Sequence, residues 1–208
     1  MTGTSTGDQA FQGDQATGEG HLIAADGVGP LTQRDYVAVV EGTSCTPGEA
    51  RERLLNRFAE FSPNSLAKFM RPDGEETPLK EEDELCVRIL SQGLYPVVVT
   101  HVDEHSLTMR TREPHPEAGR ISFGAAQDAE GRLVLHIRSR ARINGPFRWL
   151  GYEVIGKHMQ TRVWVTFLQR WAEACGGAVR GEVVLSTDQV EETPADQGER
   201  EHATFNTG

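Results

Sequence analysis

The chain has 208 residues, three cysteines and a formal net charge of −10. This length suits one domain with tails, and the acidic balance argues against a nucleic-acid-binding protein, which would present a basic face. No stretch reaches the roughly 18 apolar residues of a membrane span, and the first residues lack the features of a secretory signal. Because the cysteines are odd in number and far apart, we expect reduced thiols and a cytoplasmic protein.

Both ends of the chain are rich in small and polar residues. Residues 1–30 are dominated by Gly, Thr, Gln and Asp, and residues 187–208 add glutamates. Segments of this composition bury too little apolar surface to offset the entropy lost on ordering. We therefore predict disordered tails at 1–30 and 187–208 around one domain at 31–186, unless the domain surface or a partner holds a tail in place.

A strand and a helix open the domain. Residues 34–42 are rich in β-branched side chains and end on glycine, which is typical of a strand. Thr46 then supplies a helix N-cap, Pro47 suits the first helical position, and Glu49 completes a capping box. The apolar residues of this helix recur on one face: Ala50, Leu54, Leu55, Phe58 and Phe61. A second short helix is predicted at 65–70.

A run of antiparallel strands follows. Alternating or continuous apolar residues predict strands at 84–90, 95–102, 106–112, 120–127 and 132–143. The last two are joined by a tight hairpin at 128–131, whose glycine takes the left-handed position. With residues 34–42 this gives six strands, and a short one is predicted at 181–185. One face of such a sheet is apolar and needs a cover.

A long C-terminal helix is predicted to supply this cover. The stretch 144–175 contains all three tryptophans, and from Lys157 onward its apolar residues form a helical stripe. The glycines at 176–177 end the helix by the left-handed route. We expect Gly151 and Gly156 to kink or break the helix near its start.

This order of elements resembles the helix-grip fold of the SRPBCC superfamily, the START-like proteins. Residues 34–58 (RDYVAVVEGTSCTPGEARERLLNRF) resemble the opening of bacterial members. Residues 115–123 (HPEAGRISF) resemble an uncharacterised branch, a domain-of-unknown-function family of bacteria and plants. The resemblance covers about 34–177. It implies an α+β fold, in which a curved antiparallel sheet of six to seven strands wraps around the long C-terminal helix.

Residues 101–105 (HVDEH) bring two imidazoles and two carboxylates close together, a composition that suits a metal. The segment is a hairpin turn, however, and lacks the helical i, i+4 spacing of a zinc-protease motif. We interpret it as a solvated turn and predict no metal site.

The motif at 115–119 offers His115 and Glu117 as a base and an acid at the mouth of a cavity. Alternatively, its proline and glycine only set a bend before a strand. Tyr152 and His158 are the other candidate catalytic groups. The sequence contains no serine–histidine–acid set, phosphate-binding loop or cofactor motif, so we predict no cofactor.

Arginines alternate along the longest strand. Arg138, Arg140 and Arg142 share one face, and Leu135 and Ile137 lie on the other, so the arginines cannot line the same cavity as these apolar residues. They could hold an anionic ligand or a protein partner. Alternatively, they form a solvent-exposed face that is paired with scattered glutamates.

The resemblance implies a cavity between the sheet and the long helix that holds an apolar small molecule, such as a lipid or a polyketide. The residues expected around this ligand are Tyr95, Val97, Val99, Met109, Phe123, Leu135, Ile137, Trp149, Tyr152, Met159 and Val163. Gln160 could help to orient it. We therefore hypothesise ligand binding, with or without acid–base chemistry of the cyclase or dehydratase kind. The alternative is a non-enzymatic, co-chaperone-like interaction module that uses the sheet surface.

Overall fold

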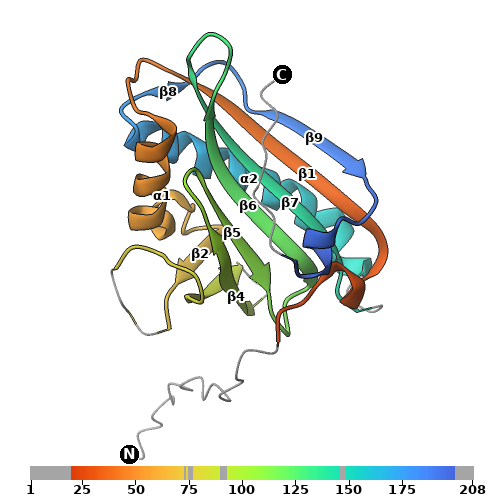
Figure 1. The fold of residues 1–208 in the computed structure, drawn as a ribbon. Coiled ribbons are helices and arrows are strands. Elements are labelled where there is room, and N and C mark those ends of the chain that lie inside the picture. The colour runs from red at the N-terminus through yellow and green to blue at the C-terminus, as the bar shows by residue number, and fades with distance from the viewer. Residues whose placement is uncertain (1–19, 73, 75–76, 90–92, 146–148, 200–208) are drawn as a thin grey trace, which may run out of the picture.

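One curved antiparallel sheet wraps around a long helix, α2 (Trp149–Ala174), with α1 (Pro47–Phe61) beside it (Figure 1). This arrangement is the α+β helix-grip architecture that the sequence predicts. The computed structural model describes residues 20–72, 74, 77–89, 93–145 and 149–199, and for 149–159 it describes the backbone alone.

The sheet has nine strands among the described residues, so the prediction of six to seven strands was too low. Its order is β2-β3-β4-β5-β6-β7-β1, and β8 and β9 both pair with the remaining edge of β1. The two strands that escaped prediction, β2 and β8, have only four and two residues, and the short strand predicted at 181–185 corresponds to β9 at 184–189. The strands are β1 (Val28–Glu41), β2 (Ala67–Met70), β3 (Glu84–Ile89), β4 (Gly93–Val102), β5 (Ser106–Thr111), β6 (Glu117–Gln127), β7 (Leu133–Ile143), β8 (Ala178–Val179) and β9 (Val184–Gln189).

The short helix predicted at 65–70 is wrong. Residues 67–70 form β2, which pairs antiparallel with β3, and Ala67 and Phe69 are buried whereas Lys68 is exposed. So short a helix would leave most of its backbone groups unpaired, whereas strand pairing satisfies them. The alternation of buried and exposed residues is the strand signal.

Helix α1 begins as the sequence predicts. The Glu49 amide donates to Thr46 Oγ1 at 3.3 Å, and the Thr46 amide donates to Glu49 Oε2 at 2.8 Å. These two bonds form the expected capping box and satisfy donors that the first turn leaves without partners.

Replacing Thr46 with Ala should therefore lower the free energy of unfolding by about 1 kcal/mol, because the helix loses its side-chain cap. Urea unfolding monitored by circular dichroism measures this change. Thr46→Ser keeps the hydroxyl and should stay close to the native stability. Equal losses in both variants would assign the effect to packing of the threonine methyl group instead.

Helix α2 is continuous through Gly151 and Gly156, so the predicted break at these glycines is wrong. Each glycine costs a helix about 1 kcal/mol relative to alanine, and packing of the rest of the helix outweighs that cost. The C-terminal end is confirmed: Gly176 has φ +78°, and the Gly177 amide donates to the Ala172 carbonyl at 3.1 Å.

Aromatic rings fill the space between the two helices and the sheet. The ring centroid of Phe58 in α1 lies 5.0 Å from those of Phe69 and Phe123 and 5.1 Å from that of Phe167 in α2. The Trp171 indole donates to the Ala50 carbonyl at 2.8 Å, which ties α2 to α1. The edge-to-face contacts of Phe58 with Phe69 and Phe123 stabilise the core beyond their buried area.

Two segments that composition predicts to be disordered carry structure. Residues 24–26 form the 3-10 helix η1, β9 runs to Gln189, and Pro194–Gln197 form a second 3-10 helix, η2. Ala195 and Asp196 are buried against the sheet. Composition misled here because polar contacts with the domain hold the C-terminal segment in place. The remaining parts of both tails, 1–19 and 200–208, lie outside the described residues.

Candidate functional site

The inner face of the sheet, which α2 covers, changes character along the strands. One cross-strand row is large and apolar, with Tyr36, Ile137 and Phe123 side by side. Two residues further along, the matching row contains Arg34, Ser139 and Ile121, and the row after that contains Ala141 and Gly119. Small and polar side chains at this end leave space beneath the helix.

That space is a cavity of about 100 Å³ between the sheet and α2. Its volume is well below the roughly 300–1,000 Å³ of a pocket for a drug-sized ligand. It is closer to the ~150 Å³ of an engineered protein cavity that binds benzene. The apolar wall includes Phe69, Val97, Met109, Phe123, Val163 and Trp164. The polar end includes Thr111, His115, Glu117, Ser139 and Gln160.

Glu117 joins three elements at the polar end. Its Oε1 accepts from Arg34 Nη1 in β1 at 3.4 Å, and its Oε2 accepts from Gln160 Nε2 in α2 at 3.1 Å. The Arg34 and Glu117 side chains are only 10% and 13% exposed. The carboxylate is therefore fixed between the sheet and the helix, where a bound molecule could donate a hydrogen bond to it.

Tyr36 lies in the neighbouring row and is buried. Burial raises the pKa of Tyr36, although the Thr161 side chain hydrogen-bonds with its hydroxyl. The phenol therefore stays protonated at neutral pH, and its contact with Thr161 holds α2 against β1.

His115 is buried at the other side of the polar end. Its Nδ1 lies 3.0 Å from both the amide nitrogen and the carbonyl oxygen of Glu117, so this backbone unit fixes the orientation of the imidazole. The Tyr95 ring packs edge-on against it with a centroid distance of 5.5 Å, and Asn144 Nδ2 donates to the His115 carbonyl at 2.9 Å. The motif thus sets the bend before β6 and also places two polar groups at the cavity.

The structure brings together part of the predicted site. Four of the expected ligand-contacting residues line the cavity, with the candidate catalytic pair His115 and Glu117: Val97, Met109, Phe123 and Val163. Val99, Leu135 and Ile137 belong to the adjoining core, and Tyr95 packs behind His115. The remaining candidates are in the part of α2 whose side chains are not described: Trp149, Tyr152, His158 and Met159. All of these roles stay predictions.

Several residues at the site were missed as binding groups. The sequence pattern predicts Phe69 and Trp164 as core residues and Thr111 as an ordinary position of an alternating strand, but all three line the cavity. The link from Arg34 to Glu117 spans 83 positions and carries no local signal. Ser139 and Ala141 did carry one, because small residues in the middle of an apolar strand face indicate missing volume.

The three strand arginines lie on the outer face, away from Leu135 and Ile137, as their alternation predicts. Each contacts an acid of this chain. Arg138 Nε donates to Asp35 Oδ1 at 2.7 Å, and Arg140 Nη2 donates to Asp196 Oδ2 at 2.7 Å. Arg142 forms an ion pair with Glu192 at 2.5 Å. These contacts agree with the second of the two interpretations, a face whose arginines pair with acidic residues of the chain.

No helix in the described ranges is long and apolar enough to cross a membrane.

Comparison with known proteins adds a family and a fold. Residues 39–171 match the family described as Domain of unknown function (DUF1990). Among solved structures, the di-domain ARO/CYC StfQ from the steffimycin biosynthetic pathway is 14% identical, with a TM-score of 0.50 over 73% of this chain and 51% of its own. The likeness to StfQ confirms the predicted helix-grip fold, and the family match confirms the predicted uncharacterised branch.

Two plant proteins show weaker likeness. Ginseng major latex-like protein 151 from Panax ginseng is 13% identical, with a TM-score of 0.47 over 69% of this chain and 97% of its own. A Thalictrum norcoclaurine synthase point mutant is 11% identical, with a TM-score of 0.48 over 71% of this chain and 98% of its own. No curated protein matches the sequence.

Proposed function

Because the chain belongs to the DUF1990 family, whose description assigns no activity, we propose a function from the cavity itself. The protein binds a small, largely apolar molecule with one polar end, between the sheet and α2. The observation that carries this proposal is an apolar cavity that ends in the fixed carboxylate of Glu117. The apolar end of such a ligand leaves water and contacts the apolar wall of the cavity. Its polar end donates a charge-assisted hydrogen bond to the carboxylate of Glu117.

The volume limits the size of the ligand. About 100 Å³ suits a molecule near the size of a substituted benzene ring. A lipid or a polyketide would fit only if the walls moved apart. The proposed ligand class is therefore a small aromatic or short aliphatic molecule that carries a hydroxyl or carbonyl group.

The second part of the proposal is that the cavity catalyses a reaction by acid–base chemistry. His115 would serve as the acid and the carboxylate of Glu117 as the base, since both groups lie at the polar end of the cavity. In a dehydration, Glu117 would take the proton from a carbon next to a carbonyl, and His115, as an imidazolium, would protonate the hydroxyl that leaves as water and so become neutral. The apolar wall would exclude bulk water from this step, and the cyclase name of StfQ agrees with it.

Binding is tested by filling the cavity. Ala141 lines it, whereas Ala126 lies on the opposite face of the same sheet. Phenol should raise the melting temperature of the native chain and of Ala126→Leu in a saturable way. It should not do so for Ala141→Leu, whose added methyl groups occupy the space. The same phenol shift in Ala141→Leu would place binding elsewhere and overturn the proposal.

The polar end has its own test. Phenol can donate a hydrogen bond to Glu117 and benzene cannot. The native chain should therefore bind phenol about 10- to 150-fold more tightly than benzene, since a hydrogen bond to a charged group contributes about 1.5–3 kcal/mol. Glu117→Gln should reduce this ratio while benzene binding persists, as measured by ligand-observed NMR. An unchanged ratio would remove Glu117 from the binding role.

The alternative, a protein-interaction module that uses Arg138, Arg140 and Arg142, has less support because these side chains already contact Asp35, Asp196 and Glu192.

A further inference from the structure

Three arginines stand in one row across the outer face of the sheet. The register pairs Arg110 of β5 with Arg120 of β6, and Arg120 with Arg140 of β7. Arg110 is 5% exposed and Arg140 7%. Like charges directly opposite one another destabilise a sheet, and a buried charge costs free energy unless it is paired. This row therefore needs anions close to it.

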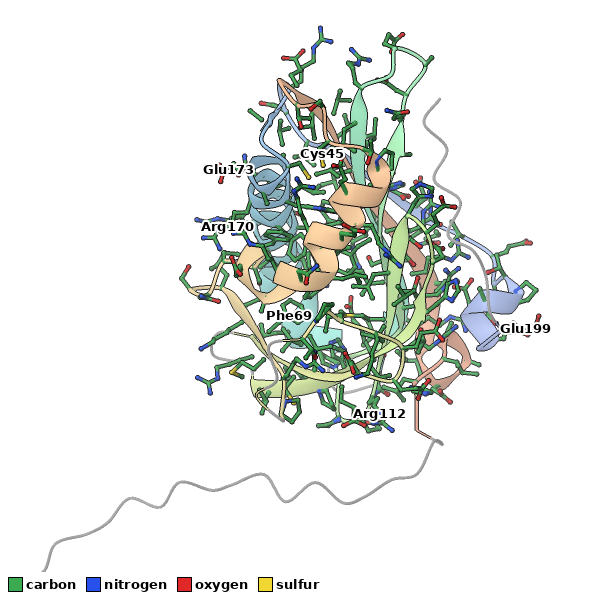
Figure 2. The ribbon with its side chains drawn as sticks, turned by 60° about the vertical axis from the view of Figure 1, so that its left-hand side comes forward. Cys45, Phe69, Arg112, Arg170, Glu173 and Glu199 are labelled. Carbon is green, nitrogen blue, oxygen red and sulfur yellow. The ribbon has the colours of Figure 1, made fainter. Side chains whose placement is uncertain are left out.

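The C-terminal segment supplies one carboxylate. Asp196 of η2 accepts from Arg120 Nε at 2.9 Å and from Arg140 Nη2 at 2.7 Å, and its own side chain is inaccessible to solvent. In Figure 2, Glu199 marks this outer side of the sheet, whereas Phe69 lies on the helix-covered side. Segment and sheet together enclose the arginine row.

Arg110 is the member of the row that makes no ion pair among the described residues. Its Nη2 donates to the Ala195 carbonyl, which is neutral, and its Nη1 is buried without an acceptor. Burial and the neighbouring Arg120 lower the pKa of Arg110. The nearby charge of Asp196 raises this pKa in part, but Nη1 of Arg110 keeps no acceptor among the described residues.

Arg110 is one of the residues that line a cleft of about 40 Å³ on this face. Its walls include Thr108, Arg110 and Arg120 from the sheet, and Ala195 and Gly198 from the C-terminal segment. A cavity that holds a single water has a volume of roughly 10–15 Å³. The cleft therefore has room for one small ion. Glu199 also borders it, but this residue is exposed and water can solvate its carboxylate.

We infer that this cleft binds one small monovalent anion, of the size of chloride or formate, which accepts a hydrogen bond from Arg110 Nη1. The anion balances the charge of Arg110, to which Asp196 gives no direct ion pair because its oxygens already bind Arg120 and Arg140. Since one wall of the cleft belongs to η2, the anion also holds the C-terminal segment against the sheet. This site is separate from the cavity under α2 and does not depend on the function proposed for that cavity.

The test is an exchange of anions at constant ionic strength. Replacing gluconate, which is too large for the cleft, with chloride or formate should raise the melting temperature of the full chain in a saturable way. The shift should vanish in Arg110→Met. It should persist in Arg57→Met, which removes an exposed arginine of α1 that pairs with Glu60. Equal shifts in the native chain and Arg110→Met would reveal a general salt effect and overturn the inference.

A second measurement keeps the inference falsifiable if Arg110→Met fails to fold. Chloride-35 NMR should show line broadening by the native chain, and added formate should reverse it by competition. Chloride or formate in place of gluconate should also slow protease cleavage of the C-terminal segment, because the anion holds η2 to the sheet. If the native chain does not broaden the chloride line, the cleft holds no such anion.

Discussion

Replacing Asp196 with Asn should lower the free energy of unfolding by about 3–5 kcal/mol, the range for removing one partner of a buried ion pair. Asp196 is the shared acceptor of Arg120 and Arg140, and it also accepts the Thr193 amide hydrogen at 2.9 Å. The variant leaves these guanidiniums buried without that carboxylate. Urea unfolding measures the loss, and Glu199→Gln, at an exposed acid of the same segment, should change stability by less than about 0.5 kcal/mol.

The pH dependence of Asp196→Asn provides a second, independent readout. Burial alone would raise the pKa of Asp196, but hydrogen bonds from Arg140 and the Thr193 amide lower it from 3.8 to about 2. Because the folded pKa lies below the unfolded one, this stability is fully present above pH ~4 and is lost as the pH falls towards 2. It amounts to about 2 kcal/mol. Asp35, whose pKa is also lowered to about 2, contributes in the same pH window.

The native chain should therefore lose stability steeply between pH 4 and pH 2. Asp196→Asn should lose less over that range, because it keeps only the part that comes from Asp35 and from the other carboxyl groups with a lowered pKa, such as Asp103. If the two acid profiles are parallel, the C-terminal carboxylate does not interact with the arginines in solution.

Replacing Gly119 with Ala should cost about 4 kcal/mol or more, which marks a severe local clash. A Cβ at this position would lie 2.2 Å from the Arg140 carbonyl oxygen and 2.8 Å from the Ala141 Cα, both in the backbone of β7. The residue has φ +154°, a conformation that side chains rarely adopt. The strands would have to separate beside the cavity, so phenol binding should weaken together with stability.

Gly131 is the matched control. It also has positive φ, +77°, but a Cβ there would meet nothing within 4 Å. Gly131→Ala should therefore cost only the backbone term of about 1–2 kcal/mol. Thermal unfolding of both variants separates the cost of the positive φ angle from the cost of the clash between the new Cβ and β7. Similar losses of stability at the two positions would show that β6 and β7 are further apart than they are in the structure.

Local signals in the sequence account for most of the fold. Thr46 and Glu49 are three positions apart and specify their helix start without help from the rest of the chain. The long strands β6 and β7 alternate over 11 residues each, enough to fix both strand and face. Residues 67–70 were misread because their apolar residues fit either period over so short a length.

Local sequence signals predict some of the residues that line the cavity but not the contacts that fix its polar end. The residues expected around the ligand include Val97 and Met109, which do lie on the face that meets α2 and line the cavity. The contacts that fix Glu117 come from positions 83 and 43 residues away, and no pattern in one sequence relates them. The role of Asp196 was hidden for the same reason: its partners lie 76 and 56 residues before it, and its surroundings in sequence are those of a disordered tail.

The C-terminal segment also bears on where this domain can be cut. The family match ends at residue 171, before β9 and η2, and it begins at residue 39, after most of β1. A fragment with those limits would lack Arg34 and Tyr36 from the cavity side, and it would expose Arg120 and Arg140 on the other. The stretch that sequence comparison detects is thus shorter than the unit that folds. Protein for crystallisation or for a binding screen should run at least from residue 20 to residue 199.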